Sequence, residues 1–268
     1  RRDTFGTCFC SRDRRSRSQS FSKVRKNVLE IVQGLENNRP DMNAAFVVHR
    51  LRSLANPANV AGMARYGIST KGTLGVDIPT LRKMAKDIGA DQKLSQELWE
   101  SGIHEARLLA GFVGDPERVT EKQMDAWARD FDSWDVCDLV CSNLFDRTPF
   151  ACGKAVEWTR RKETFVKRAG FVLMAALSVH DKEAKDATFL KFLPIIKREA
   201  ADDRNFVKKA VNWALRQIGK RNTRLNAAAV RTAKAIKELD SRAARWIAAD
   251  ALRELTSQAV QRRLRAKR

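Results

Sequence analysis

Apolar residues recur every three or four positions along most of this chain, which is the spacing of one face of an α-helix. From about Ser22 onward, few runs alternate between apolar and polar residues as strands do. Most glycines and prolines stand where a helix would end. The pattern therefore predicts an all-α protein. The predicted helices cover 22–37, 41–55, 57–66, 78–89, 93–101, 103–113, 120–131, 133–145, 149–160, 163–179, 185–200, 203–220, 222–238, 240–254 and 256–266.

Related segments recur along the chain, at 165–171, 206–213 and 242–248, and each carries a basic residue at a similar place. These basic residues are Arg168, Lys209 and Arg245, separated by 41 and 36 residues. Paired-helix HEAT or armadillo repeats are roughly 40 to 47 residues long. The spacing therefore predicts a curved solenoid of HEAT-like helical repeats with a concave groove that can follow an extended partner. The alternative is an irregular all-α globule whose segments resemble one another only through amphipathic patterning.

The repeats define three predicted parts of the chain. Residues 1–21 are rich in Arg and Ser and cannot bury a core, so we expect a disordered basic tail there. This composition also resembles a transit peptide, and sequence without a function is an equally good reading. A HEAT-like repeat domain is expected over 22–255, and a basic C-terminal helix or tail over 256–268.

Trp134 and Asp138 lie one helical turn apart, on the side of their predicted helix that faces away from its apolar stripe. That stripe is formed by Val136, Leu139, Val140 and Leu144. Because a buried Trp contributes strongly to stability, a Trp kept beside a carboxylate on the other face indicates a binding surface.

A second stripe follows the helix predicted over 203–220. Its core face is formed by Val207, Val211, Ala214 and Ile218, and another side carries Lys209, Trp213, Arg216 and Lys220. Basic groups interleaved with an aromatic ring suit a nucleic acid, since cations pair with phosphates while the ring packs on sugar or base. The alternative is that Trp213 fills the seam between two repeats and the cations are merely solvated.

Arg168 stands in a helix that is apolar nearly all round, where a guanidinium requires a charged partner. Asp138 is the candidate partner that would complete a site. A structural ion pair with Asp135 or Glu163 is the alternative.

The overall charge identifies the class of partner. The formal net charge is +20 and the pI is near 10.3, and such a field attracts polyanions, with nucleic acid as the first candidate. No apolar run approaches a membrane span and no secretory signal is visible, so we expect an intracellular protein without a membrane partner. Five cysteines without a regular framework favour free thiols in a reducing compartment. With only three scattered histidines, we expect no metal site.

A carboxylate between aromatic rings in a basic groove has few catalytic uses. Near Asp138 the sequence offers no His for a nucleophilic triad, no Gly-rich phosphate loop and no second carboxylate placed to share a metal. What remains is electrostatic stabilisation of an oxocarbenium ion, which is the chemistry of glycosidic bond cleavage.

Three ordered motifs resemble those of the AlkD-like DNA alkylation-repair glycosylases, a family built from HEAT-like repeats. They are Trp134-x-x-x-Asp138, Lys167-Arg168 at the start of an apolar helix, and the segment 206–216, and the resemblance runs from about residue 40 to 255. It implies a monofunctional glycosylase that removes 3-methyladenine and 7-methylguanine from duplex DNA without a metal or organic cofactor, and without flipping the base. The notable implication is that no general acid is needed, because the alkylated purine is already cationic.

The resemblance also implies roles for single residues. Asp138 would be catalytic, Trp134 and Trp213 would contact the deoxyribose of the lesion, and Arg168 would support the site and the DNA backbone. We expect DNA contacts from the basic residues Lys167, Lys208, Lys209, Arg216 and Lys220.

Two other functions remain open. The first is a non-catalytic HEAT-like scaffold that binds DNA or RNA, and the second is a protein-interaction scaffold with an acidic partner. Since a single groove suffices for the glycosylase, we expect a monomer. We also expect the protein to be cytoplasmic and associated with the nucleoid.

Overall fold

The structure is a computed structural model that describes residues 42–266. The chain divides into two units, Arg1–Phe46 and Val47–Arg268, and the site described below belongs to the second. The helices are α2 (Ala44–Ser53), α3 (Pro57–Ala64), α4 (Ile78–Ile88), α5 (Gln92–Glu100), α6 (His104–Val113), α7 (Glu121–Arg129), α8 (Trp134–Asn143), α9 (Ala151–Trp158), α10 (Thr164–His180), α11 (Asp186–Glu199), α12 (Asn205–Gly219), α13 (Thr223–Lys237), α14 (Arg242–Leu255) and α15 (Gln258–Arg265), with a 3-10 helix, η1 (Phe145–Arg147). Between residues 42 and 266 there is no strand, so the predicted all-α class is confirmed.

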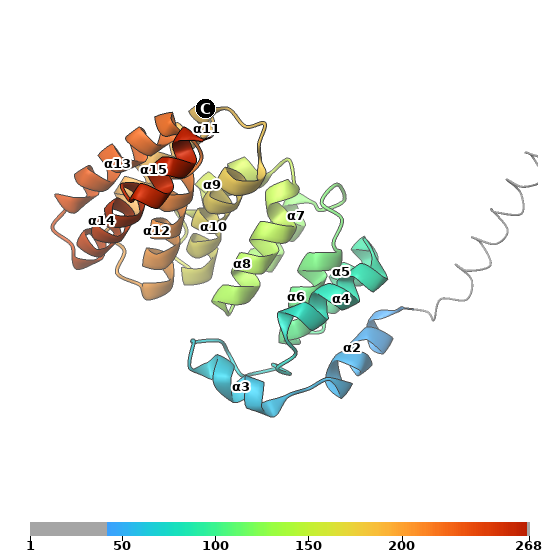
Figure 1. The fold of residues 1–268 in the computed structure, drawn as a ribbon. Coiled ribbons are helices and arrows are strands. Elements are labelled where there is room, and N and C mark those ends of the chain that lie inside the picture. Colours follow the sequence, from blue (N-terminus) through green and yellow to red (C-terminus); the bar gives the residue numbers. More distant parts are fainter. Residues whose placement is uncertain (1–41, 267–268) are drawn as a thin grey trace, which may run out of the picture. The chain divides into compact units, whose positions relative to one another are not determined.

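The second unit consists of two rows of helices. In one row, each even-numbered helix from α4 to α14 packs on the next even-numbered helix (Figure 1). Odd-numbered helices pack on this row, with α5 on α6, α9 on α10, and α13 on α12 and α14. The odd-numbered helices α11 and α13 also contact each other. Stacking of helix pairs with every second helix in contact is the arrangement expected of paired-helix repeats.

Helix starts follow from local sequence. Eight of the described helices begin after a side chain that accepts a hydrogen bond from a backbone N–H of the first turn, as N-caps do. These residues are Asn43, Asn56, Asp77, Asp91, Thr120, Asn222, Ser241 and Ser257. Predicted and observed boundaries agree within a few residues. The predicted helix 22–37 and the predicted tail 1–21 lie outside the described residues, whereas the helix predicted at 256–266 is present as α15.

The middle of the repeat array is α10. It packs against α8, α9 and α12, and every residue from Val166 to Ser178 is buried. A side chain at Gly170 would collide with α9, because its Cβ would lie 2.8 Å from the Thr159 nitrogen and 3.0 Å from the Ala155 oxygen. Glycine at this position therefore permits the close packing of α9 and α10.

The six tryptophans divide into two groups. Trp99, Trp127 and Trp158 are nearly fully buried, and the first two stack with ring centroids 4.0 Å apart. Trp134 and Trp213 are only half-buried, and Trp246 is 41% exposed. The three partly exposed rings lie on even-numbered helices, α8, α12 and α14.

Candidate active site

A cavity of about 470 Å³ lies where the first turns of α8, α10 and α12 meet the segment that follows α3. Its walls are formed by Arg65, Tyr66, Gly67, Trp134, Arg168, Asn205, Phe206 and Lys209. Aromatic and basic side chains therefore share one hollow, with contributions from four separate parts of the chain.

Trp134 forms one wall and is held in place by the segment after α3. Its indole N–H donates a hydrogen bond to the carbonyl oxygen of Tyr66 at 3.0 Å. Gly67 follows with a φ of 73°, and a Cβ there would lie 3.1 Å from the ring of Phe206. A glycine is required for this backbone conformation and for the approach to Phe206.

Asp138 and Arg168 form a bidentate ion pair between α8 and α10. The guanidinium donates from Nε to Oδ1 at 2.8 Å and from Nη2 to Oδ2 at 2.7 Å. Its third nitrogen, Nη1, donates to the carbonyl oxygen of Phe206 on α12 at 2.6 Å. Arg168 therefore connects α8, α10 and α12. Its pairing with Asp138 is the one that the sequence offered as the candidate.

The two alternative partners of Arg168 are engaged elsewhere. Asp135 contacts His104 Nε2 at 2.9 Å and the hydroxyl of Ser133, while Glu163 pairs with Arg161 at 2.5 Å. The Arg168 side chain is 7% exposed and that of Asp138 is 19% exposed. The buried guanidinium of Arg168, which lines the cavity, is therefore paired with Asp138.

Burial also affects the acidity of Asp138. It raises the pKa of this carboxyl above its ordinary value, because desolvation of the charged form outweighs the hydrogen bonds and the positive charge of Arg168. Each carboxylate oxygen carries two lone pairs, so the ion pair leaves acceptor capacity for a further group.

Trp213 is not among the residues that line this cavity. It is half-buried on α12, and the cavity is bordered instead by Phe206, which lies two turns earlier on the same helix. Phe206 packs against Phe165, with ring centroids 5.3 Å apart. Of the four residues predicted to converge, Trp134 and Arg168 line the cavity, and Asp138 is joined to it through its ion pair with Arg168. The catalytic roles of all four, including Trp213, stay predictions.

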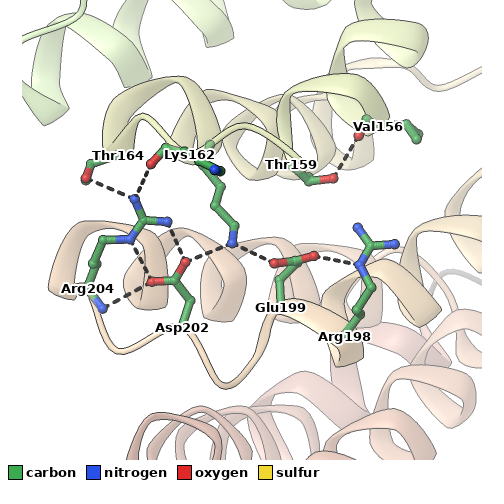
Figure 2. A network of polar contacts seen from close by, with 9 residues as sticks. Val156, Thr159, Lys162, Thr164, Arg198, Glu199, Asp202 and Arg204 are labelled. Atoms are coloured by element: carbon green, nitrogen blue, oxygen red, sulfur yellow. Dashed lines mark hydrogen bonds and ion pairs between the residues drawn. The ribbon is translucent and has the colours of Figure 1, made fainter.

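Lys167 is buried on α10 and belongs to an ion-pair cluster with the end of α11 and the segment that follows it. Its ammonium contacts Glu199 at 2.6 Å and Asp202 at 2.8 Å. Arg204 contacts the same Asp202 and also donates to the carbonyl oxygen of Lys162 at 2.6 Å, as Figure 2 shows. Lys167 is therefore held by two carboxylates, which it shares with Arg198 and Arg204. Its contact with DNA stays a prediction.

Arg216 and Lys220 are also paired with carboxylates, across α12 and α14. Arg216 contacts Asp250 at 2.9 Å and Glu254 at 3.0 Å, and Lys220 contacts Glu254 at 2.7 Å. The structure thus places both predicted DNA-binding residues in a seam between repeats. The missing signal was the partner helix, whose acids lie 34 residues farther along the chain.

Lys208 and Lys209 have different surroundings although they are consecutive. Lys209 is exposed, lines the cavity and has no carboxylate partner among residues 42–266. Lys208 lies over the ring of Trp246 on α14, 5.0 Å from its centroid. Of the five predicted DNA-binding residues, Lys209 is therefore the cation beside the candidate active site.

The sequence did not reveal Arg65, Tyr66 and Phe206 as cavity residues. Tyr66 is the single tyrosine of the chain, which is only a weak signal in the sequence. In the structure it is 74% exposed. Within the described range, no three His, Cys, Asp or Glu side chains are grouped to hold a metal ion. None of the helices described is long and apolar enough to cross a membrane.

Comparisons with known proteins bear on the family and the fold. Residues 47–255 match the sequence model of a family described as DNA alkylation repair enzyme. A search of curated proteins found no match. A solved structure described as a new family of proteins related to the HEAT-like repeat DNA glycosylases, with affinity for branched DNA structures, aligns with a TM-score of 0.67 at 21% identity. The alignment covers 80% of this chain and 96% of the other, and it confirms the HEAT-like repeat fold.

Proposed function

Because the chain belongs to the DNA alkylation repair enzyme family, we propose that it is a monofunctional DNA glycosylase. Its substrates are cationic alkylated purines in duplex DNA, such as 3-methyladenine and 7-methylguanine. It acts without a metal or organic cofactor, as a monomer on the DNA of the nucleoid. The observation that carries the proposal is the carboxylate of Asp138, fixed by Arg168 next to a cavity with an aromatic wall.

The reaction needs little from the protein beyond electrostatics. Alkylation places a positive charge on the purine, so the base leaves with the electrons of the N-glycosidic bond and needs no proton from a general acid. Water adds to the sugar carbon and releases a proton to solvent. As positive charge grows on the sugar, the negative charge of Asp138 stabilises it. The face of Trp134 holds the sugar through its C–H groups and the ring quadrupole.

Arg168 acts as a positioning residue in this mechanism. Its two hydrogen bonds fix the orientation of the carboxylate, and its charge favours the ionised form against the effect of burial. Lys209 and Arg65, both exposed at the rim, are placed to pair with backbone phosphates next to the lesion.

One observation favours a second candidate function. Both oxygens of Asp138 accept hydrogen bonds from Arg168, so the pair as a whole is close to neutral. A neutral pair stabilises an oxocarbenium ion less than an unshielded carboxylate does. A protein that binds DNA without base excision would have the same arrangement, and the solved relative is described by its affinity for branched DNA.

Release of 7-methylguanine from methylated duplex DNA separates the two functions. We expect release by the unchanged protein and a loss of at least about 100-fold in Asp138→Asn, the size of effect seen when one stabilising group is removed. Asp132→Asn is the matched control, since this exposed aspartate lies just before α8. If the unchanged protein binds DNA with steep salt dependence but releases no base, the non-catalytic function stands. If Asp138→Asn releases base as fast as the unchanged protein, Asp138 is not the catalytic carboxylate.

A further inference from the structure

A second cavity, of about 670 Å³, lies between the start of α12 and the start of α14. Its lining consists of Ala201, Asp203, Lys208, Asp240, Ser241, Arg242, Ala243 and Trp246. Neither the catalytic proposal nor the core of the protein uses this cavity. Trp246 is 41% exposed here, whereas Trp99, Trp127 and Trp158 are at most 5% exposed.

The second cavity adjoins the first through two consecutive residues. Lys208 lines the cavity at Trp246, and Lys209 lines the cavity at Trp134. Neighbouring side chains on a helix diverge by about 100°, so the first turn of α12 directs one lysine to each side. The two cavities therefore lie on different sides of the first turn of α12.

The chemistry of the second cavity suits a base better than a phosphate. In its lining, the positive charges of Lys208 and Arg242 are balanced by Asp203 and Asp240, and Asp240 also pairs with Arg245 at 3.3 Å. Carboxylates oppose a phosphate, but they accept hydrogen bonds from the N–H groups at the edge of a base. The exposed indole face offers stacking, which contributes strongly to the binding of unpaired bases.

We propose that this cavity is a second DNA site, in which one unpaired base at a junction or single-stranded tail stacks on Trp246. The base takes the place of the Lys208 ammonium, which now lies 5.0 Å from the ring centroid. The displaced ammonium then pairs with the phosphate of the same nucleotide. A base inside a duplex cannot use this site, because its two faces are covered by its neighbours. The inference rests on DNA as the partner in the proposed function, and it does not require base excision.

The test compares two unmethylated DNAs, a blunt duplex and the same duplex with a single-stranded tail that contains 2-aminopurine. Stacking on an aromatic ring quenches the fluorescence of this base. For the unchanged protein, we expect tailed DNA to bind about fivefold more tightly or better, with quenching at saturation. Trp246→Ala should lose both the preference and the quenching, whereas Trp246→Phe should keep most of each.

Two further variants complete the design. Lys208→Gln should weaken the binding of tailed DNA but leave the quenching at saturation, because the ring remains. Val179→Ala changes an exposed apolar residue at the far end of α10 and serves as the matched control. The proposal would be overturned if the unchanged protein bound the two DNAs equally tightly, or if its binding left the 2-aminopurine fluorescence unchanged. It would also be overturned if Trp246→Ala kept the full preference for tailed DNA. Base release from methylated duplex is scored separately, so failure of the glycosylase proposal and failure of this site give different results.

Discussion

The two halves of α12 carry the same sequence pattern, an aromatic residue with cations at helical spacing, and they have different surroundings. In the first half, Phe206 and Lys209 border the candidate active site, and Lys209 has no carboxylate partner in the described part of the chain. In the second half, Trp213 is half-buried and the two cations, Arg216 and Lys220, are paired with acids of α14.

This difference shows what decides whether a basic stripe can bind a polyanion. The stripe itself is not sufficient, because the next even-numbered helix can supply carboxylates that neutralise it. Asp250 and Glu254 do so for the second half of α12. Beside the first half of α12, the charged residue that α14 contributes to the second cavity is Arg242, which is a cation and cannot neutralise a lysine. A cation must therefore be judged together with the helix that packs beside it.

The largest contrast is expected in stability. Arg168→Ala leaves the half-buried carboxylate of Asp138 without its partner, and we expect a loss of about 3–5 kcal/mol in the free energy of unfolding. Arg216→Ala should lose about 1 kcal/mol, because its side chain is 29% exposed and solvent screens the pair. Urea unfolding of both variants measures the contrast. Equal losses would mean that the two ion pairs have the same environment.

Acid should affect two ion-paired carboxylates, Asp202 and Asp138, in opposite ways. Despite desolvation, hydrogen bonds from Arg204 and Lys167 lower the pKa of Asp202 to about 2. This value lies below the roughly 3.9 of an unfolded chain, so the stabilisation is complete above pH 4 and disappears as the pH falls toward 2. We expect a loss of about 2 kcal/mol from this group. Asp202→Asn should lower the stability near neutral pH and flatten this acid dependence.

For Asp138 the sign is reversed. Its pKa is raised by burial, so protonation does not destabilise the folded state through this group. Base release, however, requires the ionised form. We therefore expect base release to fall at a higher pH than the acid unfolding transition, as measured by pH profiles of both. If release persists down to the pH of unfolding, Asp138 is not the titrating group.

Trp134 on α8 and Trp213 on α12 should contribute differently to catalysis. Trp134→Ala removes the ring from the cavity wall, and we expect kcat/KM for base release to fall about 10-fold, the size of a cation–π contribution. Trp213→Ala should lower kcat/KM less, since the ring lies outside the residues that line the cavity. A larger effect at Trp213 would restore the role that the sequence suggested for it.

The smallest expected difference is in the salt dependence of DNA binding, between Lys209 on α12 and Lys220 directly after it. Lys209→Gln should reduce the slope of the salt dependence of DNA binding by about 1, with a severalfold loss of affinity at low salt. Lys220→Gln removes a charge that Glu254 already neutralises, so its slope should match that of the unchanged protein. Titrations at several salt concentrations with unmethylated duplex decide this. Equal changes of slope would show that the seam opens when DNA binds.

Much of the fold was predictable because helix periodicity is a local signal. Of the predicted apolar stripe, Val136, Val140 and Leu144 are fully buried and Leu139 is half-buried. Trp134 and Asp138 lie off that stripe and are half-buried too. The pairing of Asp138 with Arg168 could also be predicted, since a guanidinium in an apolar helix needs a carboxylate. The concave basic groove stays a prediction.

The rest of the site depends on contacts between distant segments. Tyr66 was predicted at the end of a helix over 57–66, but α3 ends at Ala64, and Tyr66 and Gly67 follow it beside Trp134 and Phe206. Lys167 could not be recognised as an ion-paired residue, because its partners Glu199 and Asp202 lie more than 30 residues away. Which cation meets which acid is decided by the packing of neighbouring repeats, and a single sequence does not contain that geometry in a local form.

Gly170 has a consequence for protein design. It lies two residues after Arg168, and the missing side chain lets α10 approach the backbone of α9. Grafting the Asp138–Arg168 pair onto another helical repeat scaffold would fail if only the two charged residues were transplanted. A methyl group at this glycine would lie 2.8 Å from the Thr159 nitrogen, so α9 and α10 would have to shift. The transferable unit is therefore at least three residues, one of which has no side chain at all.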